Sequence, residues 1–209
     1  MSPKLASTHE HLLATAKKEF LRHGYRNVSM RRISKCTGMA LGNIYYYYKT
    51  KDELYRAILD PIIRKIDEYW KFHNDPRFIM LDMVHMQRED YEEYFKSQRC
   101  MSFFTMLIDN RDDLYMLFFQ SSGSSLEDYE YILRRQLVAF GYQYIEEIEQ
   151  IYHREIKINK MFMNIHSATM VNMIKEIIRH EKLPWSDIIE LYTQFGIYSM
   201  SGWKALMRI

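Results

Sequence analysis

Apolar residues recur at steps of three and four along most of the 209-residue chain, and no segment shows sustained alternation of apolar and polar residues. The first spacing is typical of amphipathic helices, whereas alternation would indicate strands. With only 7 Gly and 4 Pro, the chain also has few residues that break helices. The pattern predicts an all-α protein without internal repeats.

The expected helices differ in length. The first opens at a capping box of Ser7 and Glu10 and ends at Gly24. A long helix runs from Thr50 toward Phe72, and Pro61 should kink it because proline removes a backbone hydrogen bond. A break follows at residues 73–76. Further helices are expected near 77–87, 89–108, 112–120, 126–153, 159–180 and 184–207, with a polar loop at 120–125.

The segment from Ser29 to Leu54 predicts two short helices joined by a turn. Ile33 and Cys36 give the first helix an apolar face, and Gly38 supplies the left-handed residue that a tight turn needs. Ile44 and Tyr48 anchor the second helix. The outward side chains offer base-edge, hydroxyl and cationic groups, namely Leu41, Gly42, Asn43, Tyr46 and Tyr47, flanked by Arg31, Arg32, Lys49 and Lys51.

This segment closely resembles the helix-turn-helix of the TetR family of bacterial transcriptional regulators. The matching positions are Ser29, Ile33-Ser34, Gly38-Met39-Ala40, Gly42-Asn43-Ile44-Tyr45-Tyr46-Tyr47-Tyr48 and Lys51-Asp52-Glu53-Leu54. Two positions depart from the family pattern. Ala40 stands where the family commonly has a Ser helix cap, at a cost of about 1 kcal/mol. Tyr48 replaces the commoner Phe and adds a hydroxyl that needs a partner.

The resemblance implies a three-helix DNA-binding head followed by a helical domain for effector binding and dimerisation. The head is expected over residues 1–58, with the helix-turn-helix at about 29–48, and the second domain over 59–209. It also implies that the second helix enters the major groove of double-stranded DNA. The DNA-contacting residues it implies are Ser29, Arg31, Leu41, Gly42, Asn43, Tyr45, Tyr46, Tyr47, Lys49 and Lys51. Asn43 suits an adenine edge or a phosphate, and Ser29 suits a helix cap as well as a phosphate contact.

The distribution of charge supports the same reading independently of the motif. Residues 1–57 hold 11 Lys and Arg against 4 Asp and Glu, whereas the remainder holds 18 against 23. The head therefore carries a net charge of +7 and the body −5, within a total of +2. Such asymmetry suits a protein that presents one end to a polyanion.

Other classes of protein find little support in the sequence. Two distant cysteines, Cys36 and Cys100, argue against a disulfide framework or a structural zinc site and favour a reducing cytoplasm. No run approaches the length of a membrane span, and neither a signal peptide nor a cofactor or metal motif is recognised. The sequence also lacks a Gly-rich phosphate loop, GxSxG and HExxH, so an enzyme is not expected.

The body is rich in Met and Phe, which suit tolerant binding of apolar groups but also ordinary core packing. The residues proposed for a ligand pocket are Met83, Met86, Phe104, Phe119 and Tyr142. The last two helices are apolar over much of their circumference and suit a four-helix homodimer interface, with Gly196 and Gly202 permitting close approach. The proposed interface residues are Met170, Met173, Ile174, Ile177, Phe195, Tyr198, Met200 and Trp203. A monomer with a large core is the alternative.

The sequence thus predicts a DNA-binding transcriptional regulator. By analogy with the family, it is a repressor that a small apolar or aromatic ligand releases from a palindromic operator. Movement at the Pro61 kink would transmit the effect of the ligand. The alternatives are a helical enzyme, or a partner-binding protein whose head binds DNA without sequence specificity.

Overall fold

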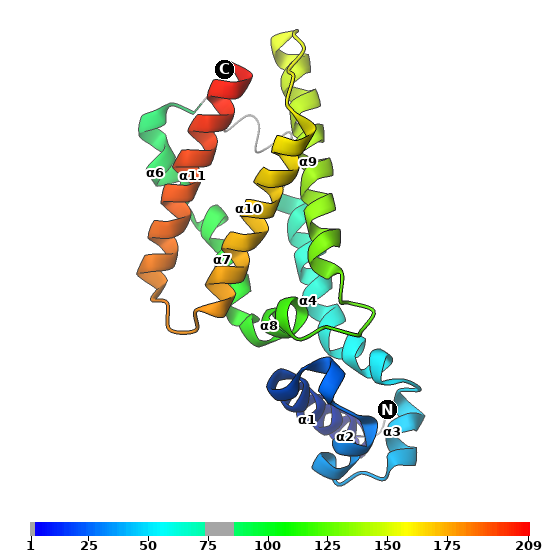
Figure 1. Cartoon of the computed structure of the whole chain (residues 1–209). Coiled ribbons are helices and arrows are strands. Elements are labelled where there is room, and N and C mark those ends of the chain that lie inside the picture. The colour runs from blue at the N-terminus through cyan, green and yellow to red at the C-terminus, as the bar shows by residue number, and fades with distance from the viewer. Residues whose placement is uncertain (1–2, 74–85) are drawn as a thin grey trace. The chain divides into compact units, whose positions relative to one another are not determined.

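The computed structural model describes residues 3–73 and 86–209, and every regular element in these two segments is a helix (Figure 1). This confirms the all-α prediction. In chain order the elements are α1 (Pro3–Asn27), α2 (Met30–Thr37), α3 (Leu41–Tyr47), α4 (Lys51–His73), the 3-10 turn η1 (Arg88–Asp90), α6 (Tyr91–Lys96), α7 (Gln98–Asp109), α8 (Arg111–Phe119), α9 (Tyr129–Tyr152), α10 (Lys160–Arg179) and α11 (Trp185–Met207).

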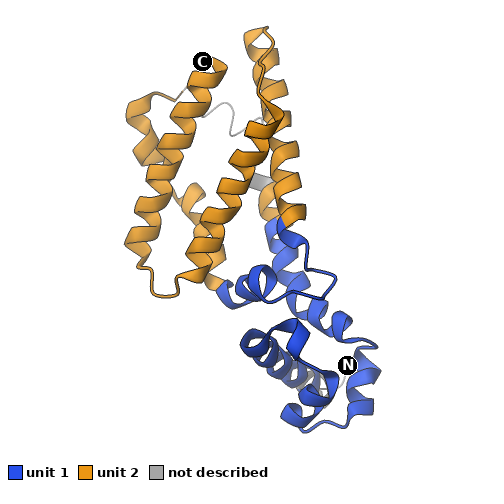
Figure 2. Cartoon of the chain, in the orientation of Figure 1, with its two compact units in different colours: residues 1–66, 110–130 blue, residues 67–109, 131–209 orange. Residues whose placement is uncertain are grey.

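Two compact units divide the chain (Figure 2). Unit 1 comprises residues 1–66 and 110–130, and unit 2 comprises residues 67–109 and 131–209. Helix α4 contributes residues to both units and continues through Pro61. Unit 1 is larger than the expected head of residues 1–58, because α8 and the loop after it pack with the N-terminal helices.

Three aromatic rings pack at the centre of unit 1, and the ring of Tyr55 meets the other two edge-on. The ring of Tyr55 lies 4.9 Å from that of Phe20 and 4.9 Å from that of Tyr25, measured between centroids. The Tyr55 hydroxyl donates to the carbonyl of Met116 at 3.0 Å, and the Tyr25 amide donates to the carbonyl of Gln120 at 2.8 Å. Burial raises the pKa of Tyr55 to about 12, which keeps this hydroxyl protonated as a donor. The cluster thereby holds the end of α8 against α1 and α4.

The course of α1 differs from the prediction at its start. The helix already begins at Pro3, so Ser7 lies inside it rather than at its cap. At Gly24 the backbone leaves helical geometry with φ 73° and ψ 158°, so the first helical run ends at the predicted residue, and a short helical segment follows the kink to Asn27. The positive φ requires glycine, whereas the atom nearest to a Cβ at this position is Oε1 of Gln120, the movable end of a side chain.

The single helix predicted over residues 89–108 is wrong. The structure has η1, α6 and α7 there, and Ser97 separates the last two with an extended ψ of 151°. The Ser97 hydroxyl accepts a hydrogen bond from the amide of Cys100 at 3.4 Å, so serine acts as a cap inside the predicted helix. Of the helix expected at 77–87, most lies outside the described residues, and residues 86–87 are not helical.

Unit 2 is organised around α11, against which α6 packs directly. The ring of Phe95 lies so close to Gly196 that a Cβ there would meet ring carbons at 2.5 and 2.6 Å. Gly196 therefore permits close approach of the Phe95 ring to α11 within one chain. Its predicted place in a dimer interface is wrong, because Gly196 is buried in the single chain. Gly202 is exposed and has open space around it. No described helix combines the length and apolar character that crossing a bilayer requires.

The contact between Phe95 and Gly196 should be sensitive to a single methyl group. Gly196→Ala is expected to lower the free energy of unfolding by about 1–3 kcal/mol, because the ring must shift in a packed core. Denaturant unfolding of Gly196→Ala, Phe95→Leu and the double variant would measure the coupling. The double variant should lose less than the two single losses combined, since the smaller side chain leaves room for the methyl group. Strict additivity would contradict the proposed clash.

Candidate nucleic-acid interface

Local hydrogen bonds build the turn between α2 and α3. The Ser29 side chain caps α2 by accepting from the amide of Arg32 at 3.2 Å, and Gly38 ends the helix with φ 68°. The Ser34 hydroxyl then donates to the carbonyl of Met39 at 2.6 Å. The cap and the left-handed glycine stand where the sequence predicted them. Cys36, however, is exposed, and Met30 joins Ile33 on the buried face of α2 instead.

Helix α3 is held from one side and leaves the other side open. Ile44 is fully buried and anchors the helix, whereas Gly42 and Asn43 are exposed in its first turn. Ala40 precedes the helix without a side-chain cap, as expected from its methyl group. Of the predicted DNA-contacting residues, the structure exposes Ser29, Arg31, Gly42, Asn43, Tyr45, Tyr46 and Lys49 and half-buries Leu41, Tyr47 and Lys51.

The tyrosines of α3 divide between the surface and the interior. Tyr46 is 75% exposed, whereas Tyr48 turns inward and its hydroxyl is hydrogen-bonded to Nε2 of His9 at 2.8 Å. The His9 ring also lies 5.3 Å from the ring of Tyr47. Burial raises the pKa of Tyr48, so the hydroxyl stays protonated. His9 thus joins α1 to the end of α3, a role that the sequence did not reveal because the two residues are far apart in the chain.

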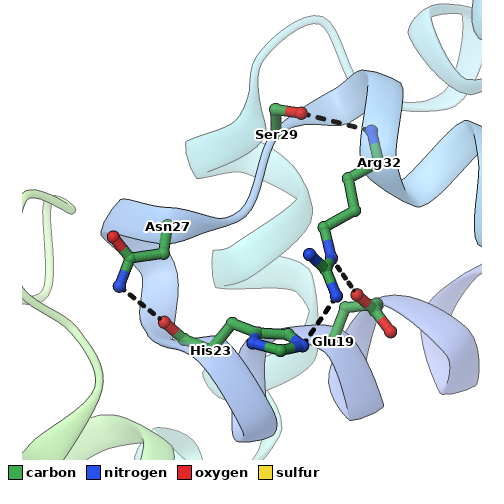
Figure 3. A network of polar contacts seen from close by, with 5 residues as sticks. All are labelled: Glu19, His23, Asn27, Ser29 and Arg32. Carbon is green, nitrogen blue, oxygen red and sulfur yellow. Dashed lines mark hydrogen bonds and ion pairs between the residues drawn. The ribbon is translucent and has the colours of Figure 1, made fainter.

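A network of polar contacts joins α1 to the start of α2 (Figure 3). The Arg32 guanidinium forms a hydrogen-bonded ion pair with the carboxylate of Glu19 and donates to Nε2 of His23 at 2.7 Å. The hydrogen bond from Arg32 holds the pKa of the Glu19 carboxyl below its ordinary value. The charge of Arg32 is therefore paired within the head although its side chain is 44% exposed, whereas Arg31 beside it is exposed and has no such partner among the described residues.

The two lysines that flank α3 have different environments. The ammonium of Lys51 donates to the carbonyls of Tyr25 at 2.8 Å and Val28 at 2.9 Å, and it lies 4.0 Å from the centre of the Tyr25 ring. Burial lowers the pKa of Lys51. The structure thus gives Lys51 partners inside the head rather than toward a phosphate. Lys49 is exposed, and its backbone amide donates to the carboxylate of Glu53 at 2.7 Å, whereas its ammonium has no partner among the described residues.

Comparison with known proteins identifies this arrangement. A model of bacterial regulatory proteins of the tetR family matches residues 12–58. The HTH-type transcriptional regulator QacR of Staphylococcus aureus is 26% identical over 129 residues, which cover 54% of this chain and 69% of that protein. A TetR-like transcriptional regulator from Rhodococcus sp. RHA1 has the same fold over 95% of both chains, with a TM-score of 0.58 and 17% identity. The head of this chain, over residues 12–58, belongs to the TetR family.

A second solved structure of a transcriptional regulator shares the fold of the whole chain. FadR from Bacillus subtilis, solved in complex with stearoyl-CoA, covers 92% of this chain with a TM-score of 0.55 at 12% identity, and 97% of FadR is covered in return. The protein is thus a TetR-family DNA-binding transcriptional regulator, as the sequence predicted, and this family is not one of enzymes. Within the described residues no cluster of three or more His, Cys, Asp or Glu is suited to a metal ion.

The described residues among those predicted for a ligand pocket have different surroundings. Phe104 is 1% exposed, and its ring lies 4.4 Å from that of Tyr192 in the core of unit 2. Met86 packs against the buried cluster around Phe95, and Phe119 belongs to unit 1. Met83 lies outside the described residues. Tyr142 is half-buried, and none of the described four lines the apolar cavity found among α9, α10 and α11.

The predicted dimer residues lie on several faces of α10 and α11. Ile174, Ile177 and Met200 are at most 4% exposed within one chain, so their assignment to a dimer interface is wrong. Both helices are apolar on two sides, and the sequence alone did not show which side faces the core. Met173 is half-buried. Of the others, Met170 and Trp203 line the cavity, whereas Trp203, Phe195 and Tyr198 line a groove at the surface of α10 and α11.

Substitution of the two lysines should separate DNA binding from folding. Lys49→Met is expected to reduce the slope of log affinity against log salt by about 0.9, the value for one phosphate contact. Its free energy of unfolding should stay within about 0.5 kcal/mol of the wild type. Lys51→Met should leave the salt slope unchanged and lower the free energy of unfolding by about 1–3 kcal/mol, since two carbonyls lose a charged donor.

Salt titrations on one fixed duplex and denaturant unfolding of the same preparations would measure both quantities. A reduced salt slope in Lys51→Met with unaltered stability would reverse the two roles. Equal effects of the two substitutions would also contradict this assignment.

Proposed function

We propose that this regulator binds a palindromic DNA operator as a homodimer and releases it when a small molecule occupies the body. The observation that supports operator reading most directly is the exposed first turn of α3. Gly42 and Asn43 lie open to solvent while Ile44 fixes the helix from behind. A short helix with an exposed amide at its start fits the major groove, where base edges differ from one another.

The contacts with DNA divide into two kinds in this proposal. Asn43 reads a base edge or holds a phosphate, and Leu41 and Tyr45 are placed to approach the groove beside it. Arg31, Lys49 and the hydroxyls of Tyr46 and Tyr47 bind phosphates on either side, and the exposed Ser29 adds a further phosphate contact. The cations supply affinity and salt dependence, and the α3 side chains supply sequence preference.

The partner proposed for the exposed apolar face of α10 and α11 is a second copy of the chain. Ile165 is 58% exposed and Tyr198 76% exposed, and both line the groove on these two helices. Phe162 and Leu206 line the same groove and are also exposed. Large apolar side chains gathered on one face are costly to leave in water, and a two-fold interface would cover the same patch on both copies. Dimerisation would set two α3 helices about 34–36 Å apart, or at a related spacing, which requires a palindromic operator.

Release by a small molecule requires a body that binds the ligand differently in two states. Helix α4 contributes to both compact units and contains Pro61, so it is the proposed route between the body and the head. The stearoyl-CoA in the FadR structure shows that a relative of this fold holds a small-molecule ligand. Repression is proposed for this chain on the same family analogy.

Selection of binding sites from random duplex DNA tests the operator proposal. The expected outcome is a palindromic consensus with half-sites about 10 base pairs apart between centres, because each copy presents one α3. On that consensus, Asn43→Ala should lower affinity by about 1–3 kcal/mol if Asn43 reads a base edge, with little effect on unselected duplexes. Binding without any consensus would favour a head that recognises DNA only by charge.

The dimer proposal is tested by placing a charge on the exposed groove. Tyr198→Glu should convert a sedimenting dimer into a monomer and weaken operator binding, because a carboxylate would be buried between two apolar faces. Tyr131→Glu is the matched control, since Tyr131 is 55% exposed but lies on α9. A Tyr198→Glu protein that remains dimeric would place the interface elsewhere.

A further inference from the structure

An apolar cavity of about 200 Å³ lies within unit 2. It is lined by residues of α9, α10 and α11, together with Trp70 from the end of α4. An enclosed apolar cavity of roughly 150 Å³ is already large enough to hold a benzene ring. The space here therefore suits a single substituted ring. Its apolar wall includes Trp70, Leu137, Phe140, Met163 and Met170.

The described residues that line this cavity include no Asp, Glu, Lys or Arg. An ionised ligand would lose its hydration and gain no opposite charge in return, which costs several kcal/mol for a buried ion. The one lining side chain that could titrate near neutral pH is His166. Burial lowers the pKa of His166, so the imidazole is held in its neutral form. The walls thus select against both cations and anions.

The hydrogen bond between Trp203 and His166 determines which nitrogen of the imidazole carries the proton. The indole Nε1 of Trp203 lies 3.0 Å from Nε2 of His166. An indole nitrogen can only donate, so Nε2 of His166 must accept. A neutral imidazole that accepts at Nε2 carries its proton on Nδ1. His166 therefore presents one N–H donor, for which no protein acceptor occurs in the described part of the chain.

Neighbouring rings hold the imidazole in place. The ring of Trp203 meets it edge-on at 5.0 Å, with 85° between the planes. On another side Phe162 lies nearly parallel to it, with centroids 6.3 Å apart. Such packing restricts rotation of the ring, so the donor has a defined direction before any ligand arrives. A few polar groups placed in a largely apolar pocket are the usual means of orienting a ligand. Besides His166, the lining carries the hydroxyls of Tyr144, Ser167 and Ser199, and the indole Nε1 of Trp70 has no hydrogen-bond partner among the described residues.

We infer that this cavity binds a small neutral ligand with one hydrophobic ring and an acceptor oxygen, which takes a hydrogen bond from Nδ1–H of His166. The ring fills the space between Leu137, Phe140 and Met163, and the oxygen lies at the His166 end. This inference rests on the proposed function, since it names the chemical class of the ligand that would control the regulator.

Four single-ring probes of similar size separate the contributions to binding. Acetophenone carries the ring and an acceptor oxygen, and cumene has nearly the same shape without the acceptor. Phenyltrimethylammonium and benzoate carry a positive and a negative charge. Calorimetric titration of the full chain should show acetophenone binding about 3- to 10-fold more tightly than cumene, the value of one neutral hydrogen bond. Both ions should bind at least about 10-fold more weakly than acetophenone.

Variants of His166 test the origin of that preference. His166→Phe keeps a planar ring but removes the donor, and it should bind acetophenone and cumene equally. His166→Gln can accept from Trp203 and still donate to a ligand, so it should retain part of the preference for acetophenone. The matched control is His180→Phe at the exposed end of α10, which should behave as the wild type. Thermal unfolding of each variant without probe shows whether it is folded.

Several outcomes would overturn the inference: no binding of any probe, equal binding of acetophenone and cumene by the wild type, a full preference in folded His166→Phe, or tight binding of either ion. Should His166→Phe fail to fold, the inference is still tested by the comparison of His166→Gln with the wild type and by the four-probe series on the wild type.

Operator affinity is measured on the same preparations. If acetophenone binds as expected but operator affinity does not change, the cavity assignment stands and ligand-controlled release fails.

Discussion

The head depends on one half-buried cation, Lys51, whose ammonium donates to backbone carbonyls. Lys51 donates to the carbonyls of Tyr25 and Val28, which lie where α1 ends and the chain turns into α2. Carbonyls at the end of a helix have no partner within the helix, and burying them without a donor is costly. One ammonium at the start of α4 replaces the missing donors and packs on the Tyr25 ring. The start of α4, the end of α1 and the entry to α2 are therefore fixed by the same side chain.

This arrangement changes how the charge of the head should be read. A net charge of +7 over residues 1–57 suggests many cations for DNA, yet Arg32 is paired with Glu19 and Lys51 is bound to carbonyls. The same division applies to the tyrosines, since Tyr48 binds His9 while Tyr46 remains open. The outward set is smaller than the composition implies. The inward set stabilises the position of α3, without which the exposed side chains could not meet base edges in a fixed register.

The sequence predicts those features whose physical causes are local. The cap at Ser29 and the left-handed turn at Gly38 depend only on neighbouring residues, and both were predicted correctly. The partners of Lys51 are 23 and 26 residues away in the chain, and spacing gave no sign of them. In unit 2 prediction from the sequence failed for a different reason. Because α10 and α11 are apolar on more than one side, the spacing of apolar residues could not show that Met200 is buried and Tyr198 exposed. The side of α11 that faces the core is determined by the helix α6 that packs against it, and the sequence of α11 alone carries no information about that contact.

The cavity and the proposed dimer groove share part of their walls. His166, Ser199 and Trp203 line both, so the same two rings separate the ligand site from the face assigned to a second copy. A ligand that displaces His166 or Trp203 necessarily alters the groove, because interiors packed at this density transmit small shifts. Ligand binding and dimer geometry would then be thermodynamically linked, each changing the free energy of the other by the same amount. In a two-fold assembly such a shift is repeated in both copies, and it changes the separation of the two α3 helices without any change inside either head.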